Sequence, residues 1–296
     1  MAFALALLVA AIVPSAAADE SYRAEVRRWR ADREARLKAD GGWLTVAGLF
    51  WLKEGENRFG TDAAGDVVLP AGSAQAQAGV FTLKGERVSV SLLPGTRGRV
   101  GGKAVQGTLA LRADTSGAPD VLEIGDLGMN VIERGGRYGI RLKDKNNPAR
   151  KTFTGLKWFD IDEDYRVEAR WVAFPQPKPV NLPNVLGQVE TLPSPGYAEF
   201  TLGGKPLRLD GVLESPQAEQ LFFILRDQTS GKETYGGGRF LYSDLPKGGK
   251  VVLDFNEAYN PPCAFTDYAT CPLPPPQNRM PIRVEAGELA YSRPGH

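Results

Sequence analysis

The stretch from Leu253 to Pro281 gathers most of the side chains that could do chemistry. After Phe255 it holds seven prolines, two cysteines and a set of carboxylates, amides, tyrosines and one arginine. A long loop without periodicity is usually functional or disordered, and proline lowers the entropy of an open loop, so that polar groups can be held in place. The candidate ligand-binding residues, one of them from an upstream glycine-rich run, are Arg239, Asp254, Asn256, Tyr259, Asn260, Tyr268, Asn278 and Arg279.

These residues leave several functions open. The first is a ligand-binding or envelope-interaction module, in which Arg239 and Arg279 would offer guanidinium groups to carboxylate or sugar oxygens. The alternative is a hydrolase or lyase that works without histidine, through carboxylates such as Asp254 and Glu257 with Tyr259 or an arginine. A purely structural envelope protein is the third, since the same groups would also satisfy loop amides and carbonyls. Whether the protein is an enzyme stays open.

Histidine chemistry is improbable for this chain. The one histidine is the final residue, His296, so histidine triads, histidine bases and histidine-bound metals are not expected. The alternating aspartates in DIDEDYR resemble a calcium loop, but Tyr165 stands where that loop needs glycine. No metal site and no cofactor are predicted.

Cys263 and Cys271 lie eight residues apart in CAFTDYATC. In an oxidising compartment an even pair is most simply a disulfide. A metal or redox pair and two free thiols are the alternatives. We predict the disulfide.

The first 18 residues carry no charge and predict a signal peptide. Met1–Val13 is an apolar run of the length of a signal core, and Ala16-Ala17-Ala18 fits cleavage before Asp19. The run is too short for a membrane-spanning helix, although the usual basic residues before the core are missing. We therefore expect an exported protein, periplasmic or secreted, with no transmembrane segment after signal removal.

Residues 19–42 are predicted to form a short N-terminal helix. Tyr22, Val26, Trp29 and Leu37 fall on one arc at 3.6 residues per turn, although Arg33 interrupts it. Gly41-Gly42 ends the pattern.

Beyond Gly42 the period changes to two, and short alternating runs are separated by glycine-containing turns. Gly135-Gly136 between two such runs is a hairpin signal. This pattern predicts a mainly β protein, an antiparallel sandwich or barrel. A first β unit over 43–146 and a second over 147–296 are expected, or one continuous domain. The proline-dense stretches 175–195 and 261–281 are expected to be loops or edge coverings.

Charge argues against nucleic acid as a partner. The chain has 36 basic and 35 acidic residues, with no basic stripe interleaved with aromatic residues. A small molecule or a component of the cell envelope is the expected partner.

Several segments together resemble a known family. These are YGGGRFLY from Tyr235, the run DFNEAYNPPCAFTDYATCPLPPPQNRMP, the AGE at 286–288 and WLTVAGLFWLKEGENRFG from Trp43. They are similar to exported bacterial proteins catalogued as domain of unknown function 1684. The resemblance covers nearly the whole mature chain and implies a bacterial, cell-envelope setting. It implies no activity, substrate or catalytic residue.

Overall fold

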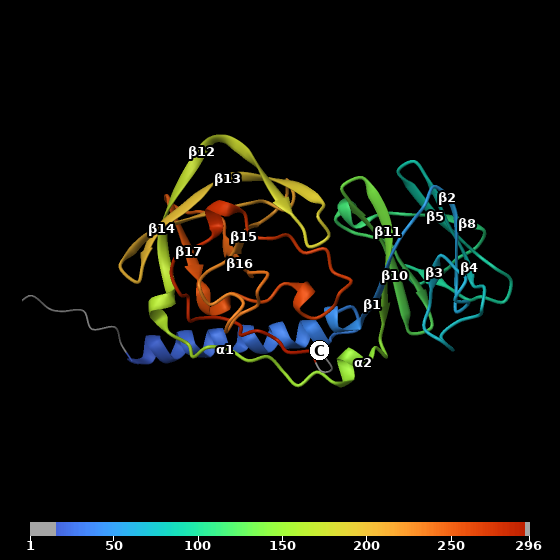
Figure 1. Ribbon diagram of the computed structural model, residues 1–296, viewed down its shortest axis with the longest axis horizontal. Coiled ribbons are helices and arrows are strands. Elements are labelled where there is room, and N and C mark those ends of the chain that lie inside the picture. The colour runs from blue at the N-terminus through green and yellow to red at the C-terminus, as the bar shows by residue number, and fades with distance from the viewer. Residues whose placement is uncertain (1–15, 294–296) are drawn as a thin grey trace, which may run out of the picture.

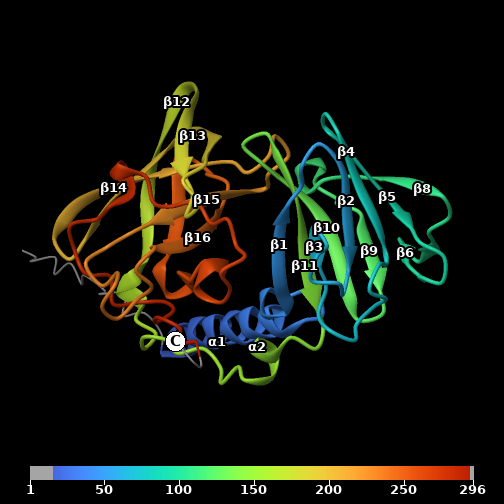
Figure 2. The ribbon, with the colours of Figure 1, turned by 45° about the vertical axis from the view of Figure 1, so that its right-hand side comes forward.

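The computed structural model describes residues 16–293, with side chains from Asp19 onward. Two β-rich lobes stand side by side, and one long helix, α1 (Ala16–Lys38), runs beneath the C-terminal lobe (Figures 1 and 2). The protein is mainly β with a sandwich-like arrangement, as predicted, and no closed barrel forms within the described residues. The other helical segments are short: η1 (Trp43–Thr45), η2 (Asp114–Ser116), α2 (Pro148–Lys151), η3 (Glu163–Tyr165), η4 (Phe255–Glu257), η5 (Pro262–Ala264) and η6 (Pro276–Asn278).

Helix α1 confirms the predicted apolar arc. Tyr22, Val26 and Leu37 are buried, and Trp29 is half-buried. The helix begins at Ala16, so the expected cleavage position lies within its first turn. The rest of the predicted signal peptide, Met1–Ser15, lies outside the described residues. None of the helices in residues 16–293 is long and apolar enough to cross a membrane.

Two sheets face each other in the N-terminal lobe. One has the order β1-β11-β10-β9-β6-β7 and the other β3-β2-β4-β5-β8. Phe59 and Phe81 from one sheet and Met129 and Ile140 from the other are fully buried in the core. The strands are β1 (Val46–Trp51), β2 (Gly55–Gly60), β3 (Val67–Val68), β4 (Gly79–Lys84), β5 (Arg87–Leu92), β6 (Arg99–Val100), β7 (Lys103–Ala104), β8 (Thr108–Leu111), β9 (Val121–Ile124), β10 (Leu127–Arg134) and β11 (Arg137–Asp144).

The predicted hairpin at Gly135-Gly136 is confirmed. Arg134 pairs with Arg137, and the two glycines between them have φ of 58° and 77°. Positive φ at both central residues makes the turn whose twist matches that of the strands, and glycine adopts it without a steric penalty.

The C-terminal lobe contains one four-stranded sheet, in the order β14-β13-β12-β17, and the separate pair β15-β16. Its core includes Phe223, Leu241, Leu253 and Phe255, all fully buried or nearly so. The strands are β12 (Arg166–Pro183), β13 (Val189–Leu202), β14 (Lys205–Gly211), β15 (Gln220–Leu225), β16 (Arg239–Asp244) and β17 (Lys250–Asp254).

The sequence predicts loops or edge coverings for residues 175–195, and the expectation of loops is wrong, because β12 and β13 run through them as a long ribbon. Asn184 N–H donates to Gln188 O at 2.8 Å. Hydrogen-bonded pairs alternate along such a ladder, so Pro179, Pro193 and Pro183 occupy the pairs that do not exchange hydrogen bonds. A missing N–H costs the ladder nothing there, which is why the strands tolerate proline.

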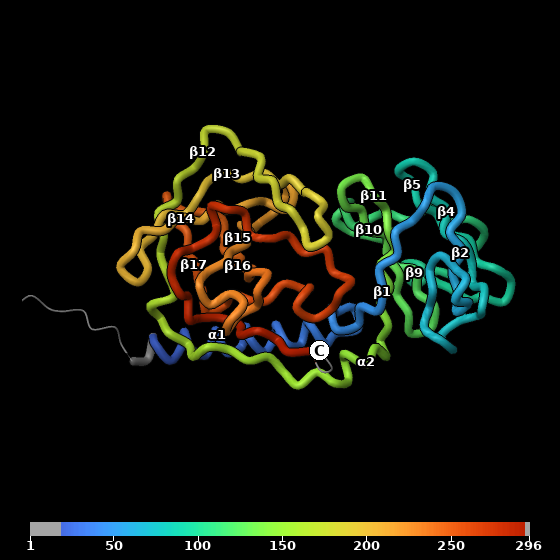
Figure 3. The backbone as a smooth tube through the Cα atoms, in the orientation of Figure 1, coloured from blue at the N-terminus to red at the C-terminus, as the bar shows by residue number. Residues whose placement is uncertain are grey.

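The C-terminal segment beyond Phe255 contains only short 3-10 turns, in agreement with the predicted loop over 261–281. Its last part and the linker 148–165 run along α1 on the same side of the molecule (Figure 3). Arg30 of α1 donates to Phe159 O of the linker at 3.0 Å, and Arg33 of α1 donates to Asn260 O of the C-terminal segment at 2.9 Å. Helix α1 is thereby tied to both segments.

Candidate functional site

The structure divides the predicted site residues into interior, exposed and groove-lining groups. Arg239 belongs to the interior: its side chain has no exposed surface. Its Nη2 lies 2.8 Å from Asp227 Oδ2, and it also donates to the carbonyl oxygens of Val284 and Ala286. It therefore joins β16 to the C-terminal segment and does not face a ligand.

The three predicted asparagines are buried as well. Asn256 Nδ2 donates to Asp162 O at 2.7 Å. Asn260 Nδ2 donates to Glu288 Oε1 at 2.8 Å, and Asn278 Nδ2 donates to Ile224 O at 3.0 Å. Their amides hold the long loop together, so we reassign them from ligand binding to structure.

Arg279 and Tyr268 are exposed, but neither lines the groove described below. With Arg239 buried and Arg279 elsewhere, the expected pair of guanidinium groups for carboxylate or sugar oxygens does not form.

The two cysteines lie close together and are both buried free thiols. The N–H of Cys263 donates to Cys271 Sγ at 3.1 Å. The chain thus brings the pair together without a bond between them, and the disulfide stays a prediction.

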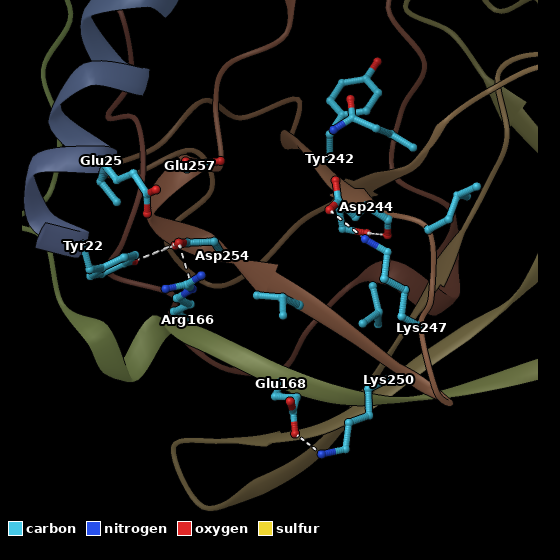
Figure 4. A pocket seen from close by; sticks show the side chains of 16 residues that line it. Tyr22, Glu25, Arg166, Glu168, Tyr242, Asp244, Lys247, Lys250, Asp254 and Glu257 are labelled. Carbon is cyan, nitrogen blue, oxygen red and sulfur yellow. Dashed lines mark hydrogen bonds and ion pairs between the residues drawn. The ribbon is translucent and has the colours of Figure 1, made fainter. Parts of the chain in front are cut away.

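Of the two remaining predicted residues, Tyr259 lines a hollow that is described below, and Asp254 opens onto a groove between α1 and the strands β16 and β17 (Figure 4). Its volume is about 500 Å³. A second hollow of about 420 Å³ adjoins it, with Gln220, Tyr242 and Glu257 lining both. Most of the lining side chains come from α1, β12, β15, β16, β17 and η4, and two come from the turn between β16 and β17.

Tyr22 and Asp254 are hydrogen-bonded to each other in the groove. The Tyr22 hydroxyl donates to Asp254 at 2.8 and 2.9 Å, and it accepts from Asn256 Nδ2 at 2.9 Å. Burial, reinforced by the Asp254 charge, raises the pKa of Tyr22 well above its ordinary value. Arg166 lies over the Tyr22 ring and 3.9 Å from Asp254. A neutral phenol therefore holds this carboxylate in one orientation.

Glu257 is one of two carboxyl groups in the groove that have no partner in the described residues. Within residues 19–293 its carboxyl group has no hydrogen bond or ion pair, although it is half-buried. Burial, followed by the charge of nearby Asp254, raises the pKa of Glu257 to about 7. Such a carboxyl can hold or release a proton near neutral pH.

Aromatic rings form the wall of the second hollow. Tyr242 stacks between Phe222 and Tyr259, with ring centroids 4.8 and 6.4 Å away. The Tyr242 hydroxyl donates to Glu214 at 2.8 Å, and burial raises its pKa. Arg33 covers the other side of this wall, 4.4 Å from the Tyr259 ring centroid.

The groove is acidic on balance. Its lining includes five carboxyl groups and three cationic side chains. Lys250 pairs with Glu168, Lys247 with Asp244 and Arg166 with Asp254. Glu25 and Glu257 are the two carboxyls left over. No three His, Cys, Asp or Glu side chains in the described part of the chain are placed to hold a metal ion.

Sequence reasoning missed the contributions of Tyr22, Glu25, Arg166 and Tyr242. Tyr22 carried a usable signal, because a tyrosine on the buried arc of a helix needs a partner for its hydroxyl. Glu25 and Arg166 carried no such signal in the sequence, since only the tertiary fold brings α1 against β12 and β17.

Comparison with known proteins gives a family without an activity. The chain is similar to the uncharacterized protein from gene locus rrnAC0354 of Haloarcula marismortui, with 35% identity over 50% of this chain and 81% of that chain and a TM-score of 0.41. No curated protein matches the chain.

Two FHA-domain structures are more distant. One is the FhaA FHA domain complexed with the intracellular domain of Rv3910, with 16% identity over 32% of this chain and 97% of that one. The other comes from an analysis of phosphothreonine-dependent FHA domain interactions, with 17% identity over 32% and 92%. Both have a TM-score of 0.23, which carries no functional argument.

Residues 151–289 match the family model described as "Protein of unknown function (DUF1684)". This segment contains all of β12–β17 and most of the groove. Through this segment, which is just under half of the chain, the protein is similar to the DUF1684 family of proteins of unknown function.

Proposed function

We propose that the protein is a ligand-binding module whose groove between α1 and β16–β17 receives a positively charged group. The observation that carries this proposal is Glu257, a half-buried carboxyl with no partner of its own in a groove of about 500 Å³. Half-burial removes part of the water around this carboxyl group, and a ligand that supplies a donor or a positive charge offsets that loss.

The choice of a cation follows from the charges around Glu257. Every basic side chain that lines the groove already has a carboxylate partner, whereas Glu25 and Glu257 have none in the described residues. An ammonium or guanidinium group of a ligand would give these two carboxyl groups a partner of opposite charge. An anion would meet unpaired carboxyls of the same sign.

Matched small molecules test this directly. Putrescine should shift the amide resonances of Tyr242 and Glu257, whereas the uncharged analogue 1,4-butanediol should not. Binding should tighten as pH rises through about 7, because Glu257 then loses its proton. Glu257→Gln should weaken putrescine binding about tenfold, as expected for the loss of one charge-assisted hydrogen bond.

Glu56→Gln is the control, since that carboxyl is exposed on β2 in the other lobe. Equal shifts from both probes, or binding that Glu257→Gln leaves unchanged, would refute the proposal.

A second candidate is acid–base catalysis without histidine. The observation that favours it is the pairing of Glu257, with its pKa of about 7, and Asp254, which Tyr22 orients at 2.8 Å. General acid–base groups contribute about 10²–10⁴-fold to a rate. Turnover of chromogenic glycosides or esters should therefore fall at least about 100-fold in Glu257→Gln and stay unchanged in Glu56→Gln. Wild-type protein that turns over none of them would count against catalysis.

Export is also part of the proposal, and the charge-free segment Met1–Ala18 supports it. Cell fractionation should place the full-length protein outside the cytoplasm and a chain lacking residues 2–18 inside it. Cytoplasmic recovery of both would refute export.

A further inference from the structure

The groove contains a second unused feature, the open edges of β16 and β17. These strands follow each other along the chain, yet they exchange backbone hydrogen bonds only at the turn, between Lys247 and Lys250. On its other edge β16 pairs with β15, and β17 pairs with β12. The hairpin is therefore splayed, and the groove lies along the gap.

The register shows which groups of β17 point into that gap. Trp171 N–H donates to Gly249 O at 2.8 Å, which fixes the hydrogen-bonded pairs of the β12–β17 ladder at every second residue. Lys250, Val252 and Asp254 are the residues in between, so their backbone groups point away from β12. The bonds of Lys250 to the turn agree with this assignment.

The same reasoning applies to β16. Phe240 and Tyr259 exchange two backbone hydrogen bonds of 2.9 Å on the side opposite β15. Tyr242 and Asp244, two and four residues further on, therefore point their backbone groups toward β17.

These open groups meet no partner in residues 16–293. The N–H and C=O of Tyr242 and of Val252 are unbonded, as are the N–H groups of Asp244 and Asp254. All four residues line the groove. An unpaired strand edge is a template on which another extended chain can pair.

We propose that the groove binds an extended peptide segment bearing a basic side chain, which adds as a strand to the open edge of β17. This inference rests on the proposed function and names its ligand. Backbone hydrogen bonds to Val252 supply the affinity, and side chains that alternate along the segment supply the choice of sequence.

The side chains beside this edge decide what the peptide carries. Val252 is 44% exposed and Leu245 is 41% exposed, which gives apolar contact next to the edge. Glu25 and Glu257, the carboxyls without a partner, lie at the Asp254 end of β17 (Figure 4). A lysine or arginine of the peptide matches them in charge.

The test uses three peptides and leaves the protein unchanged. The probe is the acetylated, amidated pentapeptide Thr-Val-Lys-Val-Thr. The second peptide has both valine nitrogens methylated, and the third has glutamate in place of lysine. The probe should bind and slow the hydrogen exchange of the Val252 amide. Each altered peptide should bind at least about tenfold more weakly, because it lacks backbone donors or the cation.

A pair of variants places the binding on β17. Val252→Pro removes the N–H that points into the gap and should weaken binding of the probe about tenfold. Val189→Pro is the matched control, since Val189 occupies an outward-facing position of the ribbon opposite Pro183, away from the groove. The stability of both variants is measured by urea unfolding. If Val252→Pro does not fold, the methylated peptide still decides the question.

Peptides that bind equally well with and without methylation would overturn strand addition, as would an unchanged Val252 amide. If putrescine still binds through Glu257 in that case, the proposed function stands and only the peptide inference fails. If neither putrescine nor the probe binds, both fail together.

Discussion

At the scale of single residues, the protein separates polar groups that hold the fold from those left free. Arg239, Asn260 and Asn278 are buried and bonded on several sides, whereas Glu257 is half-buried and unbonded in the described chain. The sequence could not separate them, because all except Arg239 lie in the same proline-rich stretch, and no residue in the sequence identifies their partners. The partner groups come from distant segments of the chain. They alone decide which side chain holds the fold and which is free to bind a ligand.

Tyr22→Phe tests the contact that orients Asp254. The variant keeps the ring and removes a hydroxyl bonded to a carboxylate at 2.8 Å. Hydrogen bonds to charged groups contribute about 1.5–3 kcal/mol, so the free energy of unfolding in urea should fall by that amount. Tyr268→Phe is the control. This ring is 42% exposed, so removing its hydroxyl should change the free energy of unfolding by no more than about 0.5 kcal/mol.

Stability should also depend on pH through Glu288 and Glu257. Burial raises the pKa of each to about 7, from an ordinary value of 4.5. Between pH 4.5 and 7 the unfolded chain releases these protons while the folded protein keeps them. The free energy of unfolding should therefore fall as pH rises through this window and level off above it.

Glu288→Gln and Glu257→Gln, which carry no titrating proton at these positions, should each flatten part of that decline. Urea unfolding at several pH values measures the slopes. Slopes equal to that of the wild type would contradict the assigned titration.

At the scale of elements, α1 shows what periodicity could and could not foresee. The apolar arc predicted the helix and its buried face, and it treated Arg33 as an interruption. In the structure Arg33 belongs to that face: it is 7% exposed, and its Nη2 donates to Asn260 O at 2.9 Å. Its Nε lies 3.5 Å from Glu288. A buried arginine on a helix is a polar anchor, and hydropathy alone counts it as exposed.

Arg33→Ala should therefore destabilise the protein strongly. Above pH 7, where Glu288 is charged, removing its partner in a buried ion pair should cost about 3–5 kcal/mol, because the carboxylate is left uncompensated. Arg28→Ala on the exposed face of α1 should change the free energy of unfolding by no more than about 0.5 kcal/mol. Similar losses in the two variants would show that the Arg33 contacts do not anchor the helix.

Strand patterns were the most reliable part of the sequence, and they failed where proline intervened. Gly135-Gly136 predicted its hairpin because the turn needs positive φ at two successive residues. Pro179, Pro183 and Pro193 pointed to a loop, since register cannot be read before the partner strand is known. The groove could not be predicted from the sequence for the same reason, because it depends on how β16 and β17 diverge.

At the scale of the whole molecule, few side chains connect the lobes. Arg134 of β10 bonds both Asp114 in its own lobe and Thr270 in the other, at 2.8 and 3.2 Å. Trp43 packs into two clusters of the C-terminal lobe, and its ring covers Arg141 of β11 at 5.0 Å. The mainly β class was predictable from short alternating runs, but these contacts join residues far apart in sequence and had no local signal.

Trp43→Ala should weaken the connection between the lobes. Replacing a fully buried tryptophan by alanine costs about 3–5 kcal/mol; Trp43 is partly buried, so we expect a smaller loss, and its ring contacts both lobes. Calorimetry should then show two transitions in place of a single one. Trp51→Ala, at the end of β1 and over Arg137 within the N-terminal lobe, should lower stability without splitting the transition. A single transition in Trp43→Ala would show that other contacts couple the lobes.

The ribbon of β12 and β13 also bears on how copies of the protein behave at high concentration. Residues in its non-bonded pairs direct their backbone outward, and three of these positions are Pro179, Pro183 and Pro193. Proline has no N–H to offer, so at these three positions the outer edges of the ribbon lack the donors that edge-to-edge aggregation needs. The ribbon thus presents fewer free donors to a neighbouring copy than a ribbon of the same length without proline.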